Sequence, residues 1–209
     1  MSVQSVNTQT QQTASTLAVR YEKRGLLVDY YANLFTPDWC LYLAKVLETM
    51  VQWSRPVSAG RRSNQTYGDP GLKYEIDFPD GNSVTREARP WSELPILAEI
   101  RNYLTHLTGQ TCNICVVQRY PSGRVRIKPH RDKEMTRGTL ICGFSFGATR
   151  ELTLTPPRYY QEEEPFNLPL EPGSLYILRP PTNDHWAHSI ERDETVEPRY
   201  SLTFRTYIP

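Results

Sequence analysis

The feature that most constrains the fold is a change in the period of apolar residues near Gln110. Before it, two stretches repeat apolar residues every three or four positions, which is typical of helices with one buried face. After it, short segments alternate apolar and polar residues with period two, as half-buried strands do. Two helices followed by many strands predict an α+β fold in which about residues 110–209 form a β-sandwich or a jelly-roll barrel.

Both helices carry terminal signals. The sequence Thr-Pro-Asp at 36–38 supplies an N-cap, a proline at the first helical position and an acidic first turn, so the first helix is expected over about Pro37–Trp53. The second is expected over about Leu94–Leu107, because Gly109 follows its end. The predicted buried faces consist of Leu43, Val46, Leu47, Met50 and Val51 in the first helix and Ile96, Leu97, Ile100, Leu104 and Leu107 in the second.

The predicted strands follow the same change of period. They are Cys112–Tyr120, Arg124–Lys128, Thr139–Gly147, Glu151–Thr155, Ser174–Leu178 and Tyr200–Tyr207. The acidic run Glu162–Glu164 is expected at the solvated tip of a hairpin. The cysteines of Cys112-Asn-Ile-Cys115 are interpreted as buried structural residues, because no helix N-terminus follows to acidify a thiol.

Two segments differ from the rest of the chain. Residues 1–18 are rich in Gln, Thr and Ser and lack a secretory apolar core, so they are expected to be a disordered leader before a single domain at 19–209. Residues 54–88 are rich in Pro, Gly, Asn and Asp and predict loops and short hairpins. Composition alone leaves open whether this segment is a functional lid or a solvated insertion.

Composition limits the class of protein. The chain has 209 residues, 38% of them hydrophobic, which suits one domain with a sizeable core. No apolar run approaches the ~18 residues of a membrane-spanning helix, so no membrane partner is expected. Four cysteines do not make a disulfide framework, which favours a reducing intracellular compartment, nuclear or cytoplasmic. The net charge of +1 argues against a strong overall field for nucleic acid.

The motif His130-Arg-Asp132 offers two metal-ligating side chains on one side of an extended backbone. A third ligand is needed, and His185 and His188 are the late histidine candidates, whereas His106 is interpreted as a structural or surface residue. Two histidines and one carboxylate suit non-haem Fe(II) with open coordination positions. Zinc with three protein ligands and a water remains an alternative on ligand chemistry alone.

The last predicted strand carries an unusual polar face. Arg199, Ser201, Thr203 and Arg205 alternate, so their side chains share one face of the strand. Two arginines cannot lie unpaired in an apolar core. Guanidinium groups bind carboxylates through two parallel hydrogen bonds, so a dicarboxylate co-substrate would account for both. The alternative is a solvent-facing strand with two surface arginines.

Six motifs occur in an order that resembles the AlkB family, and they span, with the lid stretch, about Arg61 to Arg205. The motifs are Gln118–Gly123, His130–Glu134, Ser145–Arg150, Gly173–Leu175, Pro181–Ser189 and Arg199–Arg205. The stretch Arg61–Tyr74 is similar to the nucleotide-recognition lid of the DNA-repair members of the homologue-two type, which favours the lid interpretation of about residues 54–88. The resemblance implies a double-stranded β-helix (jelly-roll) catalytic core with N-terminal helices. It also implies Fe(II) with 2-oxoglutarate and O2 as co-substrates, and oxidative demethylation of nucleic-acid bases.

The resemblance also implies individual roles. The implied iron ligands are His130, Asp132 and His188, the last chosen over His185. The implied 2-oxoglutarate contacts are Arg199, Arg205, Tyr120, Thr203 and Gln118, and the implied substrate contacts are Tyr74, Glu134 and Arg62. Gln118 and Ser201 depart from the family, which usually has asparagine at both positions, so co-substrate affinity is in question there. A base-displacing apolar finger has no clear counterpart, and Trp53 is interpreted as a helix-end aromatic residue.

A local basic cluster supports a nucleic-acid partner, and the resemblance to the DNA-repair members favours DNA over RNA. Its members are Arg61, Arg62, Arg124, Arg126, Lys128, Arg131, Lys133 and Arg137, which could contact phosphates or form part of a mixed solvated surface. The expected function is repair demethylation of 1-methyladenine and 3-methylcytosine by a monomer. Two alternatives stay open: the same chemistry on RNA or on a protein side chain, and a metal-stabilised nucleic-acid-binding module without turnover.

Overall fold

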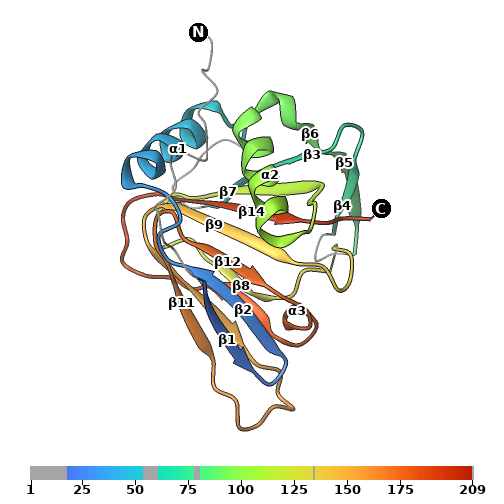
Figure 1. Ribbon diagram of the computed structural model, residues 1–209, viewed down its shortest axis with the longest axis vertical. Helices are drawn as coiled ribbons and strands as arrows, with labels where there is room; N and C mark the ends of the chain where they lie inside the picture. Colours follow the sequence, from blue (N-terminus) through green and yellow to red (C-terminus); the bar gives the residue numbers. More distant parts are fainter. Residues whose placement is uncertain (1–17, 54–60, 78–80, 134, 209) are drawn as a thin grey trace.

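The computed structural model describes residues 18–53, 61–77, 81–133 and 135–208. The predicted leader at 1–18 therefore lies almost entirely outside the described residues, as do parts of the predicted lid at 54–60 and 78–80. Two helices cover one face of a large sheet, and a smaller sheet faces its other side (Figure 1). The prediction of an α+β chain is confirmed.

The large sheet has eight strands and joins the two halves of the chain. In spatial order these strands are β1 (Val19–Lys23), β2 (Leu26–Tyr31), β12 (Leu175–Leu178), β9 (Ile141–Gly147), β14 (Arg199–Arg205), β7 (Ile114–Tyr120), β3 (Ser63–Gly68) and β6 (Arg89–Pro90). All neighbours pair antiparallel except β3 and β6, which pair parallel. Strands β1, β2, β3 and β6 precede residue 110, so the sheet extends beyond the predicted 110–209 segment.

The smaller sheet has four antiparallel strands. In spatial order they are β11 (Phe166–Leu170), β10 (Arg150–Thr155), β13 (Ala187–Ile190) and β8 (Ile127–His130). A separate hairpin of β4 (Lys73–Asp77) and β5 (Ser83–Glu87) belongs to the predicted lid segment. Residues Glu162–Glu164 lie in the connection between β10 and β11, as predicted for a hairpin tip.

The two long helices form where the apolar spacing predicts them. Helix α1 (Pro37–Met50) begins with a cap in which the Thr36 side chain accepts a hydrogen bond from the Trp39 amide. Helix α2 (Pro95–Thr108) follows a short 3-10 helix, η2 (Trp91–Glu93), and ends at Gly109, whose φ of 78° suits glycine. A third helix, α3 (Thr182–His185), is a single turn. The prediction of Met50 on the buried face is wrong: its side chain is 51% exposed, because α1 ends there.

Most of the predicted strands are confirmed with small shifts of their ends. The strand predicted over Arg124–Lys128 is wrong in its first half, because Val125 closes a turn on the Ser122 carbonyl and β8 begins only at Ile127. Strands β11 and β13 were not predicted, and neither were β1, β2 and β6 in the first half of the chain. Cys112 and Cys115 are buried free thiols, in agreement with a structural role.

Two apolar cores lie on opposite faces of the large sheet. One packs the helices against the sheet through residues such as Leu43, Leu97 and Phe204, each fully buried. The other fills the space between the two sheets and includes Tyr120, Leu154 and Ile190. Trp53 is half-buried against the first core, as expected of an aromatic residue after a helix end. The polar face of β14 points to the space between the sheets, which is where the candidate site lies.

Candidate active site

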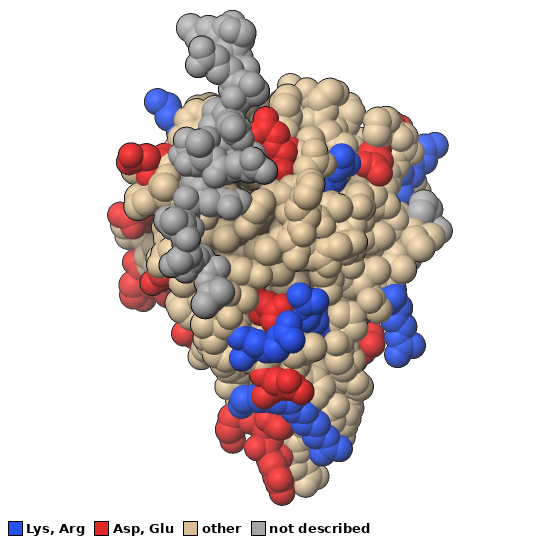
Figure 2. Space-filling view, viewed as in Figure 1, with Lys and Arg blue, Asp and Glu red and all other residues tan. Residues whose placement is uncertain are grey.

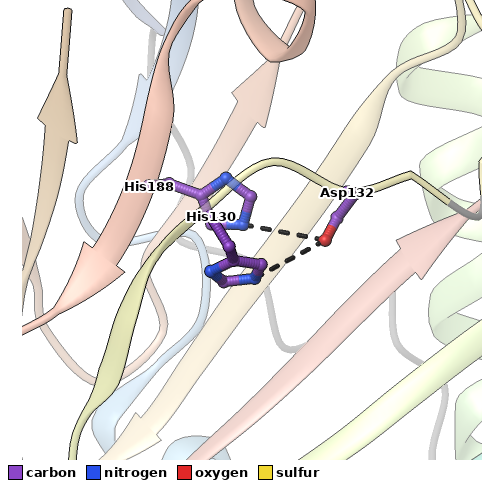
Figure 3. Close-up of side chains that lie close together, drawn as sticks. All are labelled: His130, Asp132 and His188. Atoms are coloured by element: carbon purple, nitrogen blue, oxygen red, sulfur yellow. Dashed lines mark ion pairs between the residues drawn. The ribbon is translucent and has the colours of Figure 1, made fainter. Parts of the chain in front are cut away.

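Three predicted metal-ligating residues converge between the sheets. His130 ends β8 and His188 lies directly opposite it in β13, so strand pairing places the two imidazole rings 4.2 Å apart. Asp132 follows β8 by two residues. One ligand atom from each side chain lies within 4.8 Å of the others. Figure 3 shows both histidines directed at the Asp132 carboxylate, with each Nε2 at 3.6 or 3.8 Å from Oδ1.

The electrostatics of this cluster suit a divalent cation. The Nδ1 of His130 lies 2.9 Å from the Lys128 carbonyl, which fixes the tautomer that leaves Nε2 free for a metal. Burial lowers the pKa of His188 to about 4, so its ring is neutral at physiological pH. The Asp132 side chain is only 4% exposed. Two imidazoles and one buried carboxylate make the donor set of a facial triad, so these residues fit Fe(II).

The structure distinguishes between the two histidines that were candidates for the third metal ligand. His188 lies in the cluster, whereas the Nδ1 of His185 lies 3.0 Å from the Tyr159 hydroxyl, outside it. His106 is exposed on α2 and contacts the Asn102 carbonyl, as expected of a surface histidine.

The polar face of β14 reaches from deep in the molecule to the triad. Arg199, Ser201, Thr203 and Arg205 all line a narrow pocket that also contains His130 and His188. Arg199 is 2% exposed and its Nε donates to Ser145 Oγ at 2.8 Å. Its Nη1 is buried and has no hydrogen-bond partner among the described residues. Burial lowers the pKa of Arg199 because it disfavours the charged guanidinium. An anionic ligand beside Arg199 would stabilise this charged form.

The second arginine contacts the metal-ligating carboxylate. Arg205 Nε lies 3.0 Å from Asp132 Oδ2, so one guanidinium stands at each end of the pocket. The hydroxyl of Tyr120 donates to Gln118 Oε1 at 3.0 Å on the adjoining strand β7. The longer Gln118 side chain therefore positions the tyrosine that faces Arg199, with the Arg199 guanidinium 5.1 Å from the Tyr120 ring centroid.

A larger cavity of about 280 Å³ opens from the triad toward the lid segment. Two of the predicted substrate contacts, Arg62 and Tyr74, line it beside His130, Asp132 and Arg205. Asn64 and Thr66 of β3 and Ile76 of β4 complete its lid side. Arg62 also donates to the Tyr120 hydroxyl at 3.5 Å, so it reaches the narrow pocket beside β14 as well. The third predicted substrate contact, Glu134, lies outside the described residues.

The basic cluster is less continuous than its sequence suggests. Arg126 pairs with Glu191 and Arg137 with Asp184, each at 3.5 Å. Apart from the half-buried Arg62, every member is exposed.

Figure 2 shows basic and acidic side chains next to one another at the end of the molecule that carries β1 and β2, so this face is of mixed charge. None of the described helices is long and apolar enough to cross a membrane.

Sequence reasoning missed several residues around the site. Ser145 contacts Arg199, Asn183 contacts the backbone of Asp132, and Met135 and Glu75 line the larger cavity. Ser145 and Asn183 lie within motifs that the sequence singles out, but no spacing rule assigns them a partner.

Comparisons with known proteins agree with this geometry. The profile of a family described as the 2OG-Fe(II) oxygenase superfamily matches residues 28–205. The mouse protein named DNA oxidative demethylase ALKBH2 is 37% identical over 156 residues, which cover 71% of this chain and 62% of that protein. The human alpha-ketoglutarate-dependent dioxygenase alkB homolog 3 is 32% identical over 198 residues, which cover 89% of this chain and 67% of that protein.

A solved structure titled "The structure of OsALKBH1" shares the fold. It superposes with a TM-score of 0.57 at 15% identity, covering 90% of this chain and 99% of that chain. The chain spans less than two thirds of the ALKBH2 proteins, 62% of the mouse and 56% of the human protein.

Proposed function

Since this chain belongs to the AlkB family of 2OG-Fe(II) oxygenases, we propose that it removes N-linked methyl groups from nucleic-acid bases, with DNA as the preferred substrate. The observation that carries the proposal is the junction of two pockets at one triad. One pocket is narrow and is lined by Arg199, whose buried Nη1 has no hydrogen-bond partner among the described residues. The other pocket is larger and opens toward the lid segment. The first suits a dicarboxylate and the second a base.

The metal would be held by His130, Asp132 and His188. Fe(II), together with 2-oxoglutarate and O2, supplies the oxidant that converts an N-methyl group to N-hydroxymethyl. In this conversion 2-oxoglutarate becomes succinate and carbon dioxide, with one oxygen atom entering the methyl group and the other entering succinate. The hydroxymethyl group then leaves as formaldehyde: its hydroxyl proton is released, the C–N bond breaks, and the electron pair of that bond returns to the ring nitrogen of the base.

The narrow pocket would orient the co-substrate. Arg199 would bind the carboxylate farther from the triad, since its free Nη1 lies in a buried pocket where a charge-assisted hydrogen bond is strong. Arg205 lies beside the triad and would neutralise the nearer carboxylate together with the metal. Tyr120, Thr203 and Gln118 would contribute neutral hydrogen bonds along the pocket.

The larger cavity would hold the base after it leaves the helical stack. A methyl group on the Watson–Crick edge weakens pairing and so lowers the free energy needed to flip the base. Tyr74 would contact the base, and Arg62 would bind the strand near it. We assign 1-methyladenine and 3-methylcytosine as substrates, and Glu134 as an acceptor for the exocyclic amine. The name of the ALKBH2 relatives, DNA oxidative demethylase, supports DNA as the substrate.

The four free cysteines, all buried, are compatible with an intracellular compartment, nuclear or cytoplasmic, and we propose that the protein acts as a monomer there. The function is tested by nucleoside mass spectrometry on the Fe(II)-loaded protein with 2-oxoglutarate. Oligonucleotides with 1-methyladenine would be offered as single-stranded DNA, duplex DNA and RNA, with His130→Ala as the control.

Loss of the methyl mark from DNA by wild type alone supports the proposal. Faster loss from RNA would move the substrate class to RNA. Succinate formation without loss from any oligonucleotide would contradict base demethylation, and an absence of both would contradict catalysis.

A further inference from the structure

We infer that Asn183 is a positioning residue that holds the metal-ligating Asp132 in place through its backbone. The Asn183 side chain donates from Nδ2 to the Asp132 carbonyl at 2.8 Å. Its Oδ1 accepts from the Asp132 amide at 3.0 Å. One side-chain amide thus satisfies both backbone groups of Asp132, as a paired residue of a neighbouring antiparallel strand would.

Asp132 needs such a partner because of where β8 ends. The last paired residue of β8 is His130, which lies opposite His188. Asp132 therefore lies beyond the strand ladder, although the residue is only 8% exposed. Buried backbone amide and carbonyl groups need hydrogen-bond partners, and an unpaired segment can shift. The two bonds from Asn183 continue the ladder by one residue, so they hold the Asp132 side chain toward the two histidines.

Asn183 is itself held by a firmly attached helix turn. Thr182, fully buried at the start of α3, donates from Oγ1 to the Leu27 carbonyl at 2.9 Å and accepts from the Leu27 amide at 2.7 Å. Trp186, directly after α3, donates from Nε1 to the Arg24 carbonyl at 3.0 Å. These bonds fix α3 and the residue after it to strand β2 and to the turn that precedes β2. Asn183 therefore extends from a rigid support to the metal site.

This inference rests on the proposed role of Asp132 as a metal ligand. Residues that orient metal ligands commonly change metal affinity about 10- to 100-fold when they are lost. Asn183→Ala removes both hydrogen bonds and leaves the three ligand side chains intact. We expect the Kd of the full-length protein for Mn(II), measured by the electron paramagnetic resonance of free Mn(II), to rise about 10- to 100-fold in this variant.

Two controls separate positioning from loss of stability. Asp184→Asn changes the adjacent residue of the same turn, whose carboxylate pairs with the exposed Arg137. Leu43→Ala opens a cavity in the helix–sheet core, away from the site, and lowers the thermal unfolding temperature. Both are expected to keep the Mn(II) Kd within about twofold of wild type, since neither touches Asp132 or a histidine ligand.

An unchanged Kd in Asn183→Ala, or an equal rise in Leu43→Ala, would overturn the inference. Asp132→Ala distinguishes this failure from failure of the metal site. If Asp132→Ala also binds Mn(II) with the wild-type Kd, the assignment of the triad is wrong. If Asp132→Ala loses binding while Asn183→Ala keeps it, only the role of Asn183 is wrong.

Discussion

The Nε of Arg205 lies 3.0 Å from Oδ2 of Asp132, a contact that joins the two sheets at the metal triad. Arg205 is the last residue of β14 in the large sheet, whereas Asp132 follows β8 of the smaller sheet. Both side chains are mostly buried, at 16% and 4% exposed. The carboxylate that would bind the metal is therefore already balanced by a cation of the protein, and this pairing links strand β14 to the proposed metal ligand.

Arg205→Met is expected to destabilise the metal-free protein by about 3 kcal/mol, because removing one partner leaves a buried carboxylate without compensation. Saturating Mn(II) supplies a new positive charge beside Asp132 and should reduce this difference. Urea unfolding with and without Mn(II) measures both quantities, with Arg205→Lys as the charge-preserving control. A difference of the same size in both conditions would show that the Arg205–Asp132 pair does not depend on the metal site.

Arg199→Met is expected to raise the KM for 2-oxoglutarate by about 100-fold, which corresponds to the roughly 3 kcal/mol available from hydrogen bonds to a charged group. Ser145→Ala, which keeps the guanidinium and removes the hydroxyl that accepts from the Arg199 Nε, should raise it by no more than about tenfold, equivalent to about 1.4 kcal/mol. Succinate formation at varied 2-oxoglutarate concentration provides the measurement. Equal KM values in wild type and Arg199→Met would show that Arg199 does not bind 2-oxoglutarate.

Arg62 and Tyr120 are expected to act together, because the Arg62 guanidinium donates to the Tyr120 hydroxyl at the boundary of the two pockets. Each of Arg62→Ala and Tyr120→Phe should raise the KM for 2-oxoglutarate, and the double variant should raise it by less than the product. A coupling free energy of about 0.5–1 kcal/mol is expected from the double-mutant cycle. If the effects of the two substitutions on the KM were strictly additive in free energy, Arg62 would contact the nucleic acid and not act through Tyr120.

Asp29 predicts how stability changes in acid. Its hydrogen bonds with Arg20, and then those with Arg179, lower the pKa of its carboxyl in the folded protein despite the opposing effect of burial. A lowered pKa contributes stability above the ordinary value of about 3.9, and this contribution is lost as pH falls through the folded value. Asp29→Asn should therefore be less stable than wild type at pH 7, with the difference shrinking below about pH 4. Urea unfolding at pH 7 and in acid would show this, whereas a constant difference would argue against the ion pairs.

Much of the fold follows from local sequence signals. Helices α1 and α2 carry a proline in the first turn and an apolar face, and strand β14 alternates clearly between polar and apolar residues. Strand β2 is harder to recognise, because it is buried on both faces and its apolar run has no alternation. Strand β11 contains Pro169, and a proline within a short apolar run weakens the sequence signal of a paired strand.

For the site, too, local sequence signals reveal some residues and miss others. His-x-Asp and the arginine strand are visible in the sequence because their spacing is local. The choice between His185 and His188 depends on the register of β13 against β8, which aligns His188 with His130. The contacts of Asn183 and Ser145 depend on tertiary packing and have no local signature. The order of the motifs therefore predicts the roles of the site residues, whereas the contacts between these residues are known only from the structure.

The most direct test of the central claim compares the three products of one reaction in matched variants. Wild-type protein with Fe(II), 2-oxoglutarate and single-stranded DNA carrying 1-methyladenine should release formaldehyde and restored adenine in equal amounts, with succinate accompanying them. His188→Ala should abolish all three, whereas His185→Ala, which alters a histidine outside the triad, should retain them. Equal activity of wild type and His188→Ala, or succinate without formaldehyde in the wild type, would contradict oxidative demethylation at this site.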